Sequence, residues 1–244
     1  MNMRNLTIAL FTLGILFCTT LSAQTVTISG QKKVYTRAKP ILGFKKTFSI
    51  RRPIAKAATP DLSRRITAAI DPVQLLEIDI QDELTESEWL SEADFEEVLN
   101  ENGVLTMMIW MEGSAAYSDG VTKYVVVDVA KGSRVIPSDV FSNLPGLLAA
   151  VKNKQEAEVA QAIKTIKAAP DFGDGDPKQL FEYTDFVIKN LDNFAVERTG
   201  VGFFYDYGFP NVLKALEPEG ELRLSWSEIK PFIKSGSLLA RFVS

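Results

Sequence analysis

The sequence predicts an α+β fold, in which a mainly antiparallel sheet of hairpins carries one long amphipathic helix and several shorter helices. Three stretches lead to this prediction. Residues 93–111 read as two strands joined by the turn Asn100-Glu101-Asn102-Gly103, and residues 121–129 alternate as the next strand. Residues 143–169 repeat apolar side chains at helical spacing. We expect one compact domain, because no internal repeat or low-complexity linker interrupts these elements.

Composition excludes several kinds of chemistry. The 244 residues are 46% apolar and 24% charged, as in an ordinary globular protein. The chain has no histidine, which excludes Ser-His-Asp and Cys-His catalysis, imidazole metal ligands and a histidine pH switch. Cys18 is the only cysteine, so we expect no disulfide and no thiol chemistry in the mature chain. We also expect no cofactor and no metal.

The first 23 residues have the pattern of a secretory signal peptide. Arg4 precedes an apolar run at 6–17, and small residues then suit a cleavage site. A membrane anchor is one alternative, but it needs about 20 apolar residues. A lipoprotein signal on Cys18 is another, but Phe17 stands where such signals have a small residue. We expect cleavage before Gln24, a periplasmic or secreted location, and no membrane-spanning segment after cleavage.

Charge divides the N-terminal half into two segments. Residues 24–65 hold about eleven Lys or Arg and one acid, whereas residues 71–101 hold about a dozen acids and no base. We expect the two segments to pack side by side; a basic patch for anionic envelope polymers is the alternative. A net charge of −4 does not suit nucleic acid, which requires a persistent positive field. The predicted organisation is a signal peptide (1–23), a basic N-terminal arm (24–47) and one α+β domain (48–244).

Local patterns place the elements around the first hairpin. The strand that ends at Met111 is apolar on both faces, so we expect both faces to be covered. Met107 and Trp110 are therefore predicted to be core residues rather than site residues. Earlier in the chain we expect strands at 25–28 and 45–52, a helix at 59–70 that starts at Thr59, and a segment at 75–84 that fits either a strand or a helix.

The C-terminal half begins with the long helix, which Asn143 can cap and which we expect to pack on the sheet of hairpins. The loop from Asp171 to Asp176 has three acids and two glycines, but its spacing is not that of an EF-hand, so a solvated turn is favoured over a calcium site. The remaining elements are a helix at 178–189, a hairpin at 193–207, a strand at 222–226 and a helical tail at 227–233.

The order of these elements is similar to that of a known family. The residues that carry the similarity are the turn D-x-x-x-G at 128–132, the lead-in Asp139-Val140-Phe141, the strand GVGFFYDYGFP at 200–210 and the closing WSEIKPFI at 226–233. They resemble the RsiV/PdaC-type extracytoplasmic domain, a domain of unknown function in lysozyme-sensing anti-sigma factor ectodomains and beside peptidoglycan deacetylases. The resemblance implies an exported α+β module that serves as a sensor or an accessory part.

The chain departs from that family in the loop at 113–120. Family members often carry a Gly-Gly-Ala-His-like loop there, whereas this chain reads GSAAYSDG and has no histidine. Lysozyme recognition and deacetylation therefore do not carry over from the resemblance.

We favour a noncatalytic binding or sensor-like module of the bacterial cell envelope, whose partner is a cell-wall glycan, a peptide or an envelope protein. Aromatic faces stack on sugars or peptides, while carboxylates and hydroxyls fix the ligand's orientation. Core positions on a strand are the competing interpretation for Tyr205 and Tyr207. The candidate ligand-binding residues, on two loops, are Tyr117, Ser118, Asp119, Lys123, Tyr205, Asp206 and Tyr207.

Two other functions stay open. One is a structural envelope protein that binds its partner through the basic arm. The other is a hydrolase in which Asp119, Asp128 and Asp206 converge, because glycoside cleavage needs two carboxyl groups about 5 to 10 Å apart.

Overall fold

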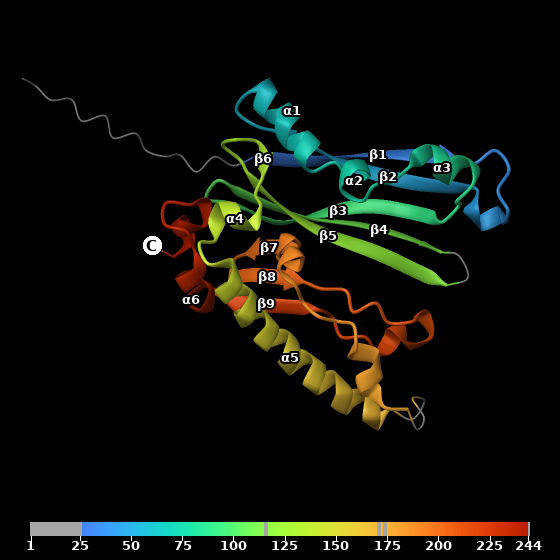
Figure 1. Ribbon diagram of the computed structural model, residues 1–244. Helices are drawn as coiled ribbons and strands as arrows, with labels where there is room; N and C mark the ends of the chain where they lie inside the picture. Colours follow the sequence, from blue (N-terminus) through green and yellow to red (C-terminus); the bar gives the residue numbers. More distant parts are fainter. Residues whose placement is uncertain (1–25, 115–116, 170–171, 173–174, 244) are drawn as a thin grey trace, which may run out of the picture.

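The computed structural model describes residues 26–114, 117–169, 172 and 175–243, and it contains two sheets, one above the other in Figure 1. The first sheet has six strands in the order β1-β2-β3-β4-β5-β6, and the second has three in the order β7-β8-β9. The predicted α+β class is confirmed, but the strands form two sheets where one was expected. The strands are β1 (Thr27–Thr36), β2 (Thr47–Lys56), β3 (Leu90–Glu101), β4 (Val104–Ser114), β5 (Ser118–Asp128), β6 (Ser133–Arg134), β7 (Phe194–Glu197), β8 (Gly200–Phe204) and β9 (Glu221–Ser225).

Side-chain caps start the two main helices where the sequence places them. Thr59 Oγ1 accepts a hydrogen bond from the Leu62 N–H at 3.2 Å, and Asn143 Oδ1 accepts one from the Gly146 N–H at 3.0 Å. The α-helices are α1 (Pro60–Ala69), α2 (Pro72–Leu75), α3 (Ile80–Thr85), α4 (Pro137–Val140), α5 (Leu144–Ala168) and α6 (Trp226–Ile229). The 3-10 helices are η1 (Gly43–Lys45), η2 (Pro177–Phe181), η3 (Ile188–Asp192), η4 (Asn211–Leu216), η5 (Lys230–Phe232) and η6 (Leu238–Phe242).

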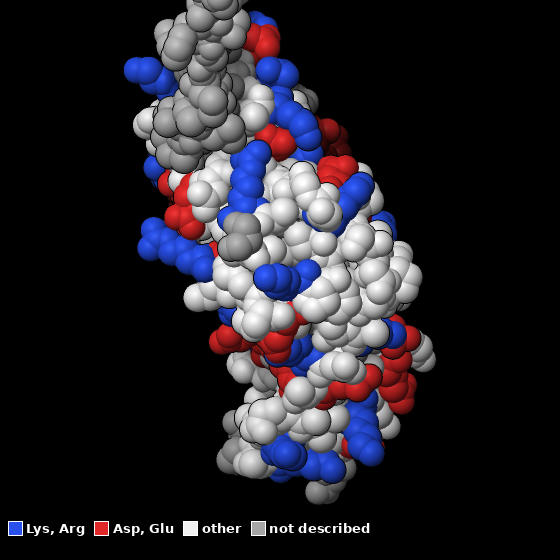
Figure 2. Space-filling view, turned by 90° about the vertical axis from the view of Figure 1, so that its left-hand side faces the viewer, with Lys and Arg blue, Asp and Glu red and all other residues white. Residues whose placement is uncertain are grey.

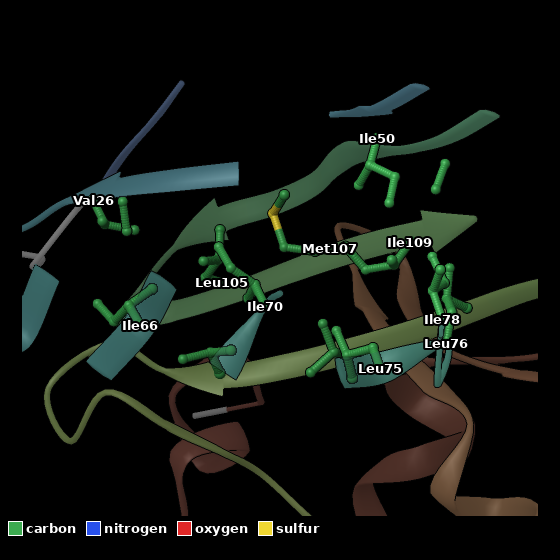
Figure 3. Packing of buried hydrophobic residues seen from close by; sticks show 14 of the residues in the cluster. Val26, Ile50, Ile66, Ile70, Leu75, Leu76, Ile78, Leu105, Met107 and Ile109 are labelled. Carbon is green, nitrogen blue, oxygen red and sulfur yellow. The ribbon is translucent and has the colours of Figure 1, made fainter. Parts of the chain in front are cut away.

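Helices α1, α2 and α3 cover one face of the six-stranded sheet, which we call the helix side (Figure 1). Alternation along β4 sends Leu105, Met107 and Ile109 to this face, where all three are fully buried. They belong to one apolar cluster with Ile66 of α1 and Leu75 of α2, as Figure 3 shows. The cluster confirms Met107 as a core residue.

The second sheet and α5 lie against the opposite face, which we call the groove side. Val104 and Val126 of the first sheet point to this side and share a cluster with Phe203 of β8 and Val151 of α5. The long helix therefore packs on the second sheet and not on the first. Trp110, predicted to be a core residue, is only half-buried, because the second sheet does not extend beneath the whole groove side.

The basic N-terminal residues pack against the acidic segment, as their charges predict. Lys32 of β1 pairs with Glu92 of β3 at 2.6 Å, and Arg51 of β2 pairs with Asp94 of β3 at 3.0 Å. β1, which lies in the expected arm, pairs with β2 along its whole length, so this part of the arm forms the edge of the sheet.

Arg37, just after β1, is the most deeply buried charged side chain among the described residues, with 2% of its surface exposed. Its guanidinium pairs with Glu83 Oε2 at 2.9 Å and donates to the carbonyl oxygens of Glu83, Lys45 and Leu90 at 2.7 to 3.0 Å. It also lies over the Phe48 ring, 4.7 Å from the centroid. Each nitrogen of the guanidinium therefore has a hydrogen-bond partner. The buried charge links the end of β1 to α3 and β3 and leaves no donor unsatisfied.

Two further predictions are wrong in detail. Residues 178–189 form no continuous helix: Phe186 is fully buried, and Gln155 of α5 donates to the Thr184 carbonyl at 2.7 Å, and these contacts hold a non-helical segment between η2 and η3. The strand expected to reach Tyr207 ends at Phe204. The ambiguous segment at 75–84 is helical, in the end of α2 and in α3.

In the described part of the chain, no helix combines the length and the apolar character that a membrane span requires.

Candidate functional site

A half-open groove of about 990 Å³ separates the outer edge of β5 from the second sheet. Thr122, Lys123 and Tyr124 of β5 line one wall, and Phe204, Tyr205 and Asp206 line the other. The volume is at the upper end of the range for ligand sites. The two walls come from segments about 80 residues apart, so the groove exists only in the folded chain.

The groove is open because β5 is much longer than the strand beside it. β6 pairs only with Val127 and Asp128, so no strand of the described residues lies beside the rest of the outer edge of β5. Along this edge the Tyr124 N–H donates to Asn193 Oδ1 at 2.9 Å, and the Gly120 N–H donates to Asp119 Oδ1 at 2.8 Å. These side chains occupy two of the outward N–H groups that a neighbouring strand would otherwise bind.

Aromatic rings join the two walls at one end of the groove. The Tyr124 and Phe204 rings stack, with centroids 3.6 Å apart and planes 16° apart, and the Tyr124 hydroxyl donates to Met108 Sδ at 3.3 Å. Burial raises the pKa of Tyr124, and the nearby carboxylate of Glu221 raises it further. Burial likewise raises the pKa of Tyr205. Both phenols therefore stay protonated at neutral pH and provide ring faces and hydrogen-bond donors.

Ion pairs hold the wall of the groove that contains Phe204, Tyr205 and Asp206. Lys214 pairs with Glu217 at 2.6 Å and with Asp206 at 3.5 Å, and the Gly208 N–H donates to Asp206 Oδ1 at 2.9 Å. Partial burial raises the pKa of Asp206, but the Gly208 hydrogen bond and the Lys214 charge outweigh it and lower the pKa overall. Asp206 is thus an anion at neutral pH.

The groove brings together three of the seven predicted site residues: Lys123, Tyr205 and Asp206. Lys123 Nζ donates to the Leu75 carbonyl at 2.8 Å, which ties the β5 wall to α2. Tyr205 and Asp206 follow directly after β8. The Tyr205 N–H donates to the Gly220 carbonyl at 2.9 Å, which continues the pairing with the chain before β9 by one residue and holds this wall of the groove.

The other four predicted residues lie elsewhere. Tyr117, Ser118 and Asp119 are exposed at the far end of β5 and do not line the groove. Tyr207 is 5% exposed and packs toward α5, where its hydroxyl donates to Glu158 Oε2 at 2.7 Å. Tyr207 is therefore a core residue, as the competing interpretation predicted, whereas Tyr205 lines the groove.

Three aspartates of the hydrolase hypothesis do not converge. Asp206 lines the groove, whereas Asp128 lines a separate pocket of about 380 Å³ beside β6 and α4, and Asp119 lines neither. The Asp128 carboxylate accepts hydrogen bonds from the Ala130 and Lys131 N–H groups at 3.0 and 3.2 Å, so it serves the turn after β5. This arrangement does not supply the pair of carboxylates that the hypothesis requires.

The face that bears α4 and α6 shows no ordered charge pattern. Lys and Arg side chains alternate there with Asp and Glu around a broad uncharged area (Figure 2). No group of three or more Asp, Glu or Cys side chains among the described residues is placed to hold a metal ion. Asp171 and Asp174 of the loop considered for calcium lie outside the described residues, and Asp176 caps η2.

Sequence reasoning missed Tyr124, Asn193 and Phe204 as groove residues. The alternation of the two strands places Tyr124 and Phe204 on known faces, but it does not show that these faces meet. Asn193 precedes β7 and carries no local signal, because its partner, the Tyr124 N–H, is 69 residues away.

Comparisons with known proteins give the fold and no activity. No protein-family profile and no curated protein matches the chain. Solved structures with a similar fold include a member of the DUF3298 family from Bacteroides fragilis, at 15% identity and a TM-score of 0.55, with 89% of this chain and 98% of that chain covered. A DUF3298 family protein from Pseudomonas aeruginosa is 13% identical, with a TM-score of 0.58 and 86% and 95% of the two chains covered. The chain therefore has the fold of DUF3298 family proteins.

Proposed function

We propose that the protein is an exported, noncatalytic binding or sensor-like module of the bacterial cell envelope, and that its ligand occupies the groove between β5 and the second sheet. The observation that carries this proposal is the stacked Tyr124 and Phe204 pair beside the uncovered edge of β5. The signal-peptide pattern of residues 1–23 supports export, and the bacterial DUF3298 proteins with the same fold support a module of this kind.

The groove walls are held in place without a ligand. Asn193 joins the two walls through the Tyr124 N–H, and Lys123 ties β5 to α2. Glu158 of α5 accepts from both the Tyr207 hydroxyl and the Gly220 N–H, so it anchors the segment that follows β8. Side chains positioned in this way lose little conformational entropy when a ligand binds.

The shape of the groove favours an elongated ligand. It follows the uncovered edge of β5 from Gly120 to Tyr124, and its walls offer ring faces, ammonium groups and carboxylates. Cell-wall glycans and peptides are elongated polymers with apolar faces and polar edges, which suits such a surface. The RsiV/PdaC-type resemblance stays a prediction that agrees with this ligand class.

The test measures binding of soluble peptidoglycan fragments, which contain glycan and peptide, to the purified protein by calorimetry. Tyr124→Leu keeps an apolar side chain at this position but removes the stacked ring and its hydroxyl. We expect it to weaken binding about tenfold, which corresponds to about 1.4 kcal/mol. Tyr183→Leu is the matched control, because Tyr183 is 93% exposed and does not line the groove.

Circular dichroism confirms that each variant is folded before binding is compared. Unchanged affinity in folded Tyr124→Leu contradicts the groove as the site. If the fragments do not bind and the peptides of the next experiment do not bind either, the proposed function is wrong.

A further inference from the structure

The free edge of β5 at Thr122 determines what kind of ligand the groove can hold. Backbone groups of alternate residues point to opposite sides of a strand. The Tyr124 N–H binds Asn193 and the Val126 carbonyl accepts from the Val135 N–H, so even-numbered residues of this strand point outward. Thr122 therefore directs its N–H and its C=O into the groove, and the described residues supply no hydrogen-bond partner for either.

The neighbouring outward groups limit this free edge to a short window. The N–H groups of Gly120 and Tyr124 are occupied by Asp119 and Asn193, but the described residues supply no partner for their carbonyl groups. Three carbonyls and one N–H are thus available over five residues. An uncovered edge with these groups is a template for an added strand.

The charge of the groove indicates what the added strand carries. Six acids and four bases line it. Lys214 is paired with Asp206 and Glu217, and Lys123 and Arg134 donate to backbone carbonyls. Among the other lining residues, Glu77, Asp192 and Glu219, like Lys189, are exposed and have no ion pair within the described residues. The lining thus has two more acids than bases, and this net negative charge favours a positively charged ligand.

These unpaired acids lie on both sides of the free edge. Glu77 follows α2 on the helix side, and Glu219 precedes β9 on the groove side. Side chains of an extended peptide alternate between the two faces of the sheet it joins. Basic residues on either face of an added strand would therefore meet a carboxylate.

We propose that an extended peptide segment rich in Lys or Arg adds to the edge of β5 at Thr122, where its backbone pairs with the Thr122 N–H and C=O. Its alternate side chains face Glu77 on one side, and Glu219 and the Tyr124–Phe204 pair on the other. This inference rests on the proposed function and specifies the ligand class of the same groove.

The first experiment measures retention of peptide pools by the purified, immobilised protein. The probe is a pool of eight-residue peptides with Lys at alternate positions and random residues between them. The control pool has Glu in place of each Lys. A third pool has Lys peptides whose alternate backbone nitrogens are methylated, which preserves the charge but removes the N–H groups of one edge. We expect at least tenfold greater retention of the Lys pool than of either control.

Variants locate the bound peptides. Thr122→Pro removes the outward N–H at an edge position where proline is tolerated, and Thr122→Ala is its control because it keeps that N–H. Glu77→Lys with Glu219→Lys reverses the charge of both walls, and Glu156→Lys on the exposed surface of α5 is the control outside the groove. We expect Thr122→Pro and the charge reversal each to weaken binding at least tenfold, and both controls to bind like the original protein.

The outcomes separate this inference from the proposed function. Equal retention of the methylated pool, or wild-type binding by folded Thr122→Pro, overturns strand addition but leaves a groove that binds by charge. Equal retention of the Lys and Glu pools overturns the basic peptide. If peptidoglycan fragments bind in a way that depends on Tyr124 while the Lys pool does not bind, the inference is wrong and the proposed function stands.

Discussion

On the helix side of the six-stranded sheet, apolar side chains are sealed beneath α1, α2 and α3, whereas the second sheet covers only part of the groove side. The buried apolar residues of the helix side form one cluster, whose members lie between Val26 and Val129 in the sequence. The groove side leaves Trp110 half-buried and the edge of β5 uncovered. The difference indicates that one face of the sheet provides stability and that the incomplete cover of the other leaves the groove open.

Ion pairs show the same contrast. Arg37 is buried with Glu83, and the backbone carbonyls around it satisfy its remaining donors. Arg223 of the second sheet pairs with Glu197 at 3.1 Å and with Glu221, but its side chain is 48% exposed. A buried charge depends on its partner, whereas water can replace a partner at the surface.

The largest predicted effect breaks the buried pair. Arg37→Ala leaves the Glu83 carboxylate buried without its counter-charge and should lower the free energy of unfolding by about 3 to 5 kcal/mol. Arg223→Ala should lower it by at most about 1 kcal/mol. Urea denaturation followed by circular dichroism measures both values. Equal losses would show that the two pairs do not differ in the way their burial indicates.

The next prediction concerns apolar packing. Ile109 is fully buried on the helix side, so Ile109→Ala should cost about 2 to 5 kcal/mol through lost burial and a residual cavity. Val121 lines the groove and is 39% exposed, so Val121→Ala should change stability by about 0.5 kcal/mol or less. Thermal melts of the two variants compare the sealed and the open regions directly. A large loss for Val121→Ala would contradict an open groove.

A third prediction concerns the anchor of the groove wall. Tyr207→Phe removes the hydroxyl that donates to Glu158, and because the acceptor is charged the cost should be about 2 kcal/mol. Burial, together with the Glu158 carboxylate, raises the pKa of Tyr207 well above its usual 10. Above pH 10 the unfolded chain loses this proton while the folded chain keeps it, so stability falls as pH rises.

Unfolding measured from pH 8 to 11 tests the pH dependence. The decline above pH 10 should be shallower in Tyr207→Phe than in the original protein. An identical slope would mean that Tyr207 does not contribute to it.

A small effect is also expected at Thr106. This residue is fully buried in β4, and its Oγ1 has no hydrogen-bond partner among the described residues. Thr106→Val replaces the hydroxyl by a methyl group of similar shape, so stability should stay within about 1 kcal/mol or increase. Urea midpoints measure the change. A loss of more than about 2 kcal/mol would indicate that the hydroxyl has a partner, such as a buried water.

Local signals predicted the elements that depend on neighbours in sequence. The turn at Asn102-Gly103 joins β3 to β4, Thr59 starts α1, and Asn143 starts α5. The charge contrast between the basic and acidic segments predicted the ion pairs between them, because complementary charges lie on adjacent strands. Tertiary contacts outweighed the local helix preference at 178–189. Phe186 is buried in the core, and the helix predicted around it does not form.

The candidate site could be predicted only in part. Lys123, Tyr205 and Asp206 line the groove, but Tyr207 was predicted as a site residue on the same grounds, although its hydroxyl donates to Glu158. Nothing in the local pattern distinguishes these tyrosines, since each is an aromatic residue near the end of a strand.

The sequence by itself determined which side chains share a face, because the two-residue period of a strand and the 3.6-residue period of a helix follow from backbone geometry. Only the tertiary structure decided what covers each face. The second sheet packs beneath part of β5 and leaves Thr122 uncovered, and contacts over about 80 residues bring Phe204 onto Tyr124. A groove is the space that such packing leaves unfilled, so no local pattern specifies it.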